Sequence, residues 1–181
     1  MTKYCIDILA DIVNRRMKKP GSSIIESLNV PRELTLEFLG TFARFEYALK
    51  RAGYVRGDDK QVSADWDRFA REIAALDPTT LAPVLGCCQY LQEHPPKKQV
   101  LIDRRLQWVL RQGSCGSAVG EILLNVRTVR NNVFHGGKFP DGPVDEPLRD
   151  EQLVTECLAV LKSLLGLPLP QNVAEHFWSG A

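Results

Sequence analysis

The sequence predicts an all-α fold, and three observations lead to this prediction. Apolar residues recur at helical spacing in several segments, Pro and Gly fall mostly between those segments, and no segment has a convincing period-2 strand pattern. The length of 181 residues, with 44% hydrophobic and 25% charged, is typical of one globular domain. We predict a single helical domain over residues 1–181, with an N-terminal helix and linker over 1–29, a core over 30–166 and a C-terminal tail over 167–181.

The first half of the chain has signals for four helices. A short helix over 4–13 ends at a basic cluster before Pro20-Gly21, and a strong amphipathic helix over 34–53 ends at Gly53. Ser63 is a candidate N-cap for a helix to about Leu76. Asp77 and Pro78 form a cap and first-turn pair for the next helix, which extends to about Glu93.

The second half has one ambiguous segment and two clear helices. After the Pro95-Pro96 connection, residues 100–110 are either helical or extended. Ser117 is a candidate N-cap for a helix over 118–134 that stops at Gly136-Gly137. Residues 138–147 are rich in Pro, Gly and Asp and predict a loop, and the apolar positions from 153 to 165 predict a last long helix before Gly166.

Charge and cysteine content exclude several classes of function. The net charge of +1 gives no field that would draw the whole molecule to a polyanion, so any such site must be a local patch. No apolar run approaches the length of a membrane span and no signal peptide pattern is present, so we expect a soluble cytoplasmic protein without a membrane partner. The five cysteines lack CxxC spacing and Cys87, Cys88 and His94 match no metal-ligand spacing, so we predict reduced thiols, no metal and no cofactor.

Functional residues gather at the end of the helix predicted over 118–134. At about 100° per residue, its valines and Ile122 form one apolar stripe, whereas Asn131 and His135 lie about 40° apart on the opposite side and Arg127 joins them one turn earlier. Arg130 and His135 are about 140° apart, so one straight helix cannot aim both at one small ligand. Either the helix loosens at His135 or two copies of the chain share a cleft.

The spacing Arg-Asn-x-x-x-His at residues 130–135 resembles the motif of the HEPN superfamily, whose members are small all-α domains and often metal-independent endoribonucleases. The resemblance implies a HEPN-like bundle of about five to seven helices with an extended loop after the motif helix. It also implies that Arg130 and His135 are catalytic, that Asn131 is the polar residue that follows the arginine, and that two motifs face each other in a homodimer. Gly137 stands where a tyrosine follows in HEPN toxins with a nucleotidyltransferase antitoxin, so the resemblance does not support inactivation through that tyrosine.

These residue types suit RNA cleavage because RNA carries its own nucleophile, the 2′-hydroxyl. Histidine can move protons near neutral pH, and arginine offers a planar fork of donors to phosphate oxygens. Asn131 could orient the imidazole or bind phosphate, and Asn132 and Lys138 lie close enough in the sequence to support the site. We therefore predict an endoribonuclease that cleaves single-stranded RNA, with toxin action, antiviral defence and a protein antitoxin or regulator left open. The alternatives are a non-catalytic module that binds RNA, a nucleotide or a protein, and a helical interaction domain in which the motif is accidental.

Glu46 is a further candidate on independent grounds. It lies in register with the apolar stripe of the helix predicted over 34–53, where an ionised carboxylate is costly without a partner. The sequence leaves two interpretations open: Glu46 orients Arg130 or Arg127, or it reaches the rim of the helix and pairs with Lys50.

Other constellations favour ordinary structural roles. Residues 113–117 with Cys115 lack the preceding strand of a nucleophile elbow. The basic cluster 15–19 and Arg104-Arg105 could follow an RNA backbone, but charge runs are usually solvated faces. The three tryptophans are interpreted as core rather than base-stacking residues; they are Trp66, Trp108 and Trp178.

Overall fold

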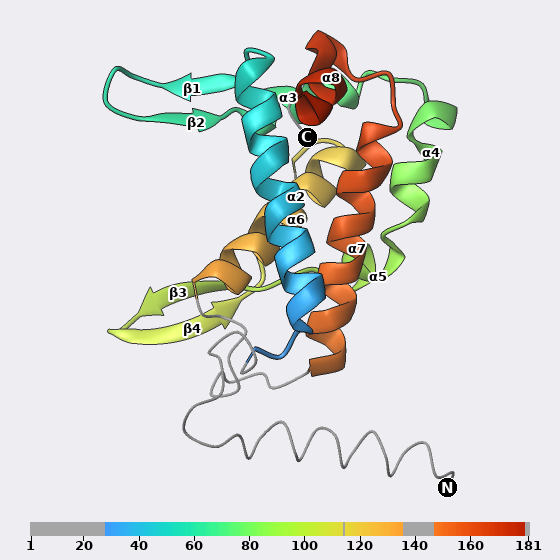
Figure 1. Ribbon diagram of the computed structural model, residues 1–181. Coiled ribbons are helices and arrows are strands. Elements are labelled where there is room, and N and C mark those ends of the chain that lie inside the picture. The colour runs from blue at the N-terminus through green and yellow to red at the C-terminus, as the bar shows by residue number, and fades with distance from the viewer. Residues whose placement is uncertain (1–27, 114, 136–146, 180–181) are drawn as a thin grey trace, which may run out of the picture.

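The computed structural model describes residues 28–113, 115–135 and 147–179. These residues form a mostly helical fold (Figure 1). The elements in chain order are α2 (Arg32–Arg51), β1 (Val55–Gly57), β2 (Val62–Ala64), α3 (Trp66–Ile73), α4 (Pro78–Gly86), α5 (Gln89–Glu93), β3 (Lys98–Ile102), β4 (Arg105–Val109), α6 (Ala118–Phe134), α7 (Pro147–Leu165), the 3₁₀ turn η2 (Pro170–Asn172) and α8 (Val173–Trp178). The helix predicted over 4–13, the loop after the motif helix and Lys138 lie outside the described residues.

The long helices α2, α6 and α7 form the centre of the molecule, and the short helices pack around them. Helix α2 contacts α6, α7 and α8, while α3 packs on α6, and α4 and α5 pack on both α6 and α7. Each long helix buries one apolar face; the face of α7 includes Leu153, Cys157, Leu161 and Leu164. Burial of these faces is the dominant favourable contribution to folding.

An aromatic cluster joins α2, α3 and α8. The ring of Trp66 at the start of α3 stacks on Phe42 and Phe45 of α2, with centroid distances of 5.2 and 5.6 Å. Phe177 of α8 packs against Phe45 at 6.0 Å. Val173 and Phe177, within the predicted C-terminal tail, are therefore part of the helical core, whereas Trp178 is 61% exposed, so its predicted place in the core is wrong.

Two antiparallel hairpins correct the prediction of an all-α fold. Strands β1 and β2 pair from Val55↔Ala64 to Gly57↔Val62, and β3 and β4 pair from Lys98↔Val109 to Ile102↔Arg105. In the view of Figure 1 both hairpins project from the same side of the helices. The ambiguous segment 100–110 is therefore largely extended, and its turn places Asp103 and Arg104 at φ values of 48° and 59°.

Two predicted helices are shorter than expected. Ser63 lies in β2, and the N-cap of α3 is instead Asp65, whose side chain accepts a hydrogen bond from the amide of Arg68. The helix predicted from Pro78 to about Glu93 is broken at Cys87 and Cys88 into α4 and α5. In contrast, α6 covers the predicted residues 118–134 and has Ser117 as its N-cap.

In the part of the chain that the structure describes, no single helix has the length and apolar character to cross a bilayer. Helix α7 and the following segment Pro170–Trp178 meet that test only as a pair, and they are bent by 118° where they join.

Candidate active site

Helix α6 positions the Arg-Asn-x-x-x-His motif at its C-terminal end. Its N-terminus is fixed by the Ser117 side chain, which accepts a hydrogen bond from the amide of Gly120 at 3.1 Å. The predicted apolar stripe is buried, and it consists of Val119, Ile122, Val126, Val129 and Val133. The motif is thus carried by a helix that packs firmly on its other face.

The guanidinium of Arg130 lies over two aromatic rings. Its central carbon is 4.9 Å from the centre of the Phe134 ring and 5.4 Å from that of Phe42 on α2. Its Nη1 donates to the side-chain oxygen of Asn131 at 3.1 Å. A guanidinium has five N–H donors, and within the described residues only this one has a protein acceptor. The rings and the amide therefore orient a cation whose other donors are free for a ligand.

His135 is the C-cap of α6, and the helix ends before it. Its φ and ψ angles of −98° and 23° depart from helical values, while its amide still donates to the carbonyl of Asn131. The exposed imidazole meets the Phe134 ring edge-to-face, with centroids 5.2 Å apart and planes at 83°. This agrees with one of the two interpretations drawn from the helical angles, that the helix loosens at His135.

Phe134 therefore contacts both predicted catalytic side chains. Since Arg130 and His135 each lie about 5 Å from its ring centre, the guanidinium carbon and the imidazole centre are at most about 10 Å apart. Phe134 is 63% exposed although it is a large apolar residue, so the group as a whole lies at the surface. The sequence analysis did not single out Phe134 or Phe42, although Phe134 falls outside the apolar stripe of α6.

The two asparagines of the motif have different surroundings. Asn131 is exposed and orients Arg130, rather than the imidazole. Asn132 is only 9% exposed, and its Nδ2 donates to the carbonyl oxygen of Lys97 at 2.8 Å. Asn132 therefore joins the last turn of α6 to the start of the β3–β4 hairpin.

Arg127 and Glu46 have partners other than those predicted. Arg127 pairs with Asp67 of α3, with Nη1 and Oδ1 2.8 Å apart, and the same carboxylate pairs with Arg56 of β1. Glu46 accepts a hydrogen bond from Trp66 Nε1 at 3.1 Å, so the predicted pairing with Arg130 or Arg127, or with Lys50, is wrong. The physical reason is that the buried indole N–H of Trp66 also needs an acceptor, and Glu46 lies within its reach.

Neither Cys88 nor Cys115 has the properties of a reactive nucleophile. Burial raises the pKa of the Cys88 thiol to about 12. Burial and the nearby Glu121 carboxylate raise the pKa of Cys115, whereas a reactive cysteine needs a lowered pKa. Within the described ranges no three His, Cys, Asp or Glu side chains gather as metal ligands would.

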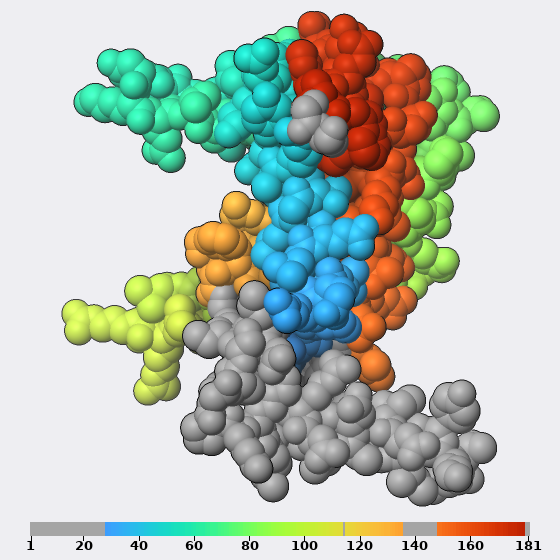
Figure 2. Space-filling view, in the orientation of Figure 1, coloured from blue at the N-terminus to red at the C-terminus, as the bar shows by residue number. Residues whose placement is uncertain are grey.

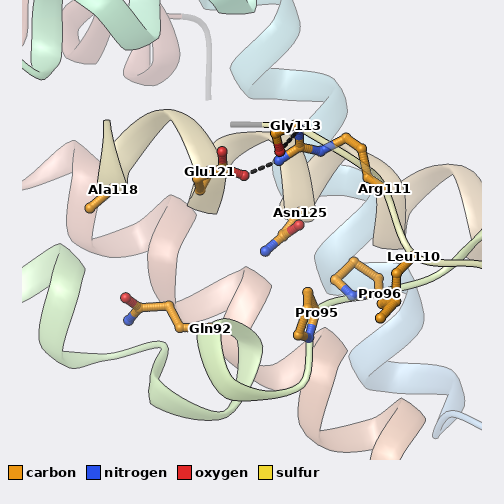
Figure 3. A pocket seen from close by; sticks show the side chains of 9 residues that line it. All are labelled: Gln92, Pro95, Pro96, Leu110, Arg111, Gly113, Ala118, Glu121 and Asn125. Atoms are coloured by element: carbon orange, nitrogen blue, oxygen red, sulfur yellow. Dashed lines mark hydrogen bonds and ion pairs between the residues drawn. The ribbon is translucent and has the colours of Figure 1, made fainter. Parts of the chain in front are cut away.

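A pocket of about 390 Å³ opens beside the first half of α6 (Figure 3). Neither Arg130 nor His135 lines it; its walls come from Gln92, Pro95, Pro96, Leu110, Arg111, Gly113, Ala118, Glu121 and Asn125. The one cation of this lining, Arg111, pairs with the Glu121 carboxylate and donates to the Gly113 carbonyl. Its charge is thus neutralised locally, so the exposed end of α6 is the better candidate for binding phosphate.

Comparisons with protein-family models, with curated proteins and with solved structures gave no significant match to this chain.

Proposed function

We propose that this protein is a metal-independent endoribonuclease of the HEPN type that cleaves single-stranded RNA. The observation that supports this proposal most directly is that Arg130 and His135 both contact the exposed Phe134 ring. This arrangement exposes a cation and an imidazole together at a surface. Both are within reach of one dinucleotide step of a bound strand.

The chemistry uses the 2′-hydroxyl of RNA as the nucleophile. A neutral imidazole takes the proton of the 2′-hydroxyl while the 2′-oxygen bonds to phosphorus, and the 5′-oxygen leaves and accepts a proton from a general acid. Arg130 binds the phosphate oxygens and stabilises the charge that develops on them. The products are a 2′,3′-cyclic phosphate and a 5′-hydroxyl.

A homodimer with facing motifs is part of the proposal. One imidazole cannot be the base and the acid at the same moment, whereas two copies of His135 at one cleft can divide these roles. Two copies of Arg130 would also double the positive charge that faces the phosphate. Toxin action and antiviral defence are the biological roles that suit such an enzyme, with a protein antitoxin or regulator as a further partner.

The central experiment measures cleavage of a labelled single-stranded RNA by the purified protein in excess EDTA. We expect cyclic phosphate ends and no cleavage of the matching DNA, because DNA lacks the nucleophile. Each of His135→Ala and Arg130→Ala should lower turnover by about 10² or more. His176→Ala on α8 is the matched control and should cleave normally. A folded His135→Ala protein with wild-type turnover would refute the assignment, and RNA binding without turnover would favour the non-catalytic module.

A second experiment tests the dimer. Sedimentation at micromolar concentration should give a twofold assembly without RNA, and a monomer would contradict the proposal. Coexpression of His135→Ala and Arg130→Ala chains then asks whether the motifs combine. The mixed dimer has one His135 and one Arg130, so it should cleave more slowly than the wild-type dimer if the cleft uses both copies of each residue; cleavage at the wild-type rate would contradict the shared cleft.

A further inference from the structure

The segment around the β3–β4 hairpin is a basic stretch of the chain, as is the cluster 15–19. Residues 97–111 contain five of the 23 Lys and Arg residues but only one of the 22 acidic residues, Asp103. This is a local excess of four positive charges in a chain whose net charge is +1, so the remainder of the chain is negative. A polyanion would therefore be attracted to this segment and not to the molecule as a whole.

Most of these charges are free of protein partners. Lys98, Arg104 and Arg105 are exposed and Lys97 is half-buried, and within the described ranges none of the four forms an ion pair. Arg111 is the exception, because it pairs with Glu121. Elsewhere on the surface Arg56, Arg68 and Lys162 are each paired with a carboxylate.

The hairpin also has an exposed apolar face. Leu101 and Leu106 are opposite each other in the strand pairing and are 68% and 69% exposed. Trp108, two residues beyond Leu106, lies on the same face because side chains alternate along a strand, and it is half-buried rather than the core residue that the sequence predicted. By the same alternation Lys98 and Arg105 lie on the opposite face, and Arg104 lies in the turn. A single strand along the edge of the hairpin can therefore stack its bases on the apolar face while its phosphates bind the cations.

The hairpin is attached directly to the motif helix. The hydrogen bond from Asn132 to the Lys97 carbonyl holds the residue before β3 against the last turn of α6, three residues before His135. Figure 2 shows the hairpin, in yellow-green, projecting well beyond the helical body. An RNA strand that passes His135 can therefore continue along the hairpin.

We propose that the β3–β4 hairpin is an arm that binds the single-stranded RNA substrate next to the Arg130–His135 motif. The exposed Lys98, Arg104 and Arg105 bind phosphates, and the Leu101, Leu106 and Trp108 face contacts bases. This inference rests on the proposed function for the identity of the polyanion. It assigns the hairpin to substrate binding and leaves the chemical step to the motif.

The test compares two triple variants of the full chain in fluorescence anisotropy with a labelled oligouridylate over a range of salt concentrations. The arm variant is Lys98→Gln, Arg104→Asn and Arg105→Gln; asparagine is chosen because it tolerates the left-handed conformation of Arg104. The control removes three exposed cations elsewhere, Arg51→Gln, Lys60→Gln and Arg71→Gln. Both sets carry His135→Ala, so that cleavage does not disturb the measurement.

Each phosphate contact on a single strand contributes about 0.7 to the slope of log K against log salt concentration, so the arm variant should reduce that slope by about 2. The control variant should keep the slope of its parent. Leu101→Ser with Leu106→Ser should weaken binding at every salt concentration without changing the slope, because these side chains contact no phosphate.

The outcomes separate the arm from the active site. An arm variant that binds RNA with the parent's affinity and slope overturns the proposal, whether or not the protein cleaves RNA. A loss of RNA affinity in the arm variant but not in the control variant supports the proposed RNA-binding role of the hairpin. If the protein in addition shows no cleavage, the proposed catalysis is wrong and the binding role of the hairpin is still supported. If the leucine substitutions change only the sedimentation of the protein and not RNA binding, the face binds a second copy of the chain and the proposal is wrong.

Discussion

Replacing Phe134 with leucine should slow RNA cleavage, because the phenyl ring contacts both proposed catalytic side chains. The Arg130 guanidinium carbon is 4.9 Å from the ring centre and the His135 ring centre is 5.2 Å from it. An exposed cation–π contact contributes about 0.5–1 kcal/mol, and an edge-to-face aromatic pair about 0.5–1.5 kcal/mol. Because Phe134 is 63% exposed, the lower values apply, and about 1 kcal/mol of orienting energy is lost.

A loss of about 1 kcal/mol in the transition state corresponds to about a fivefold fall in kcat/KM. The assay is single-stranded RNA cleavage at constant pH and salt, with Phe134→Tyr as the matched control because tyrosine keeps the ring. The same contacts are absent from the unfolded chain, so the free energy of unfolding should also fall, by up to about 1 kcal/mol. A double-mutant cycle with Arg130→Lys then measures the coupling between the two residues. Wild-type cleavage by Phe134→Leu, or an equal loss in Phe134→Tyr, would refute the reasoning.

Three further predictions concern stability. Glu46→Leu should lower the free energy of unfolding, measured in urea, by about 1–3 kcal/mol, because it leaves the buried Trp66 N–H without an acceptor. Glu46→Gln keeps an acceptor oxygen and is the control. Equal stability of the two variants would contradict this prediction. Burial raises the pKa of Tyr54, so as the pH rises above about 10 the unfolded chain loses this proton first and the protein loses stability. Tyr54→Phe should lessen that loss when the free energy of unfolding is measured against alkaline pH. An unchanged dependence of stability on pH would count against the buried phenol. Asn132→Ala should speed hydrogen exchange of the backbone amides in β3 and β4, because it removes the hydrogen bond to the Lys97 carbonyl. Unchanged exchange rates would show that the hairpin does not depend on this hydrogen bond.

The helix that carries the motif could be predicted from the sequence because its signals are local. Ser117 at the N-cap and the periodic valines place α6 over residues 118–134, as the structure has it. The break between α4 and α5 has no such local cause. The amides of Tyr90 and Leu91 at the start of α5 donate to the Glu156 carboxylate of α7, which is distant in the sequence.

The hairpins were missed for a physical reason. An alternating pattern arises when one face of a sheet is buried and the other is solvated, but β3 and β4 bury neither face deeply. Strands β1 and β2 have three residues each, which is too short for any pattern to develop. The consecutive apolar residues Val100, Leu101 and Ile102 thus left the segment 100–110 open between a helix and an extended strand.

The residues of the candidate site could be proposed from the sequence, but their contacts could not. The requirement that Glu46 find a donor was correct, but its position on an apolar stripe could not distinguish an indole N–H from a guanidinium. The support of Arg130 by Phe42 depends on how α2 packs beside α6, which is a tertiary relation that no local pattern encodes.

The packing of α8 on α2 has a consequence for how the protein is made. Arg44 Nε donates to the carbonyl oxygen of Phe177 at 2.6 Å, across a sequence separation of 133 residues. At synthesis rates of about 5–20 residues per second, a ribosome needs on the order of ten seconds to add the residues between them. During that time the aromatic face of α2 lacks the cover that α8 gives it in the folded protein. This part of the native core can therefore form only after α8 has been synthesised.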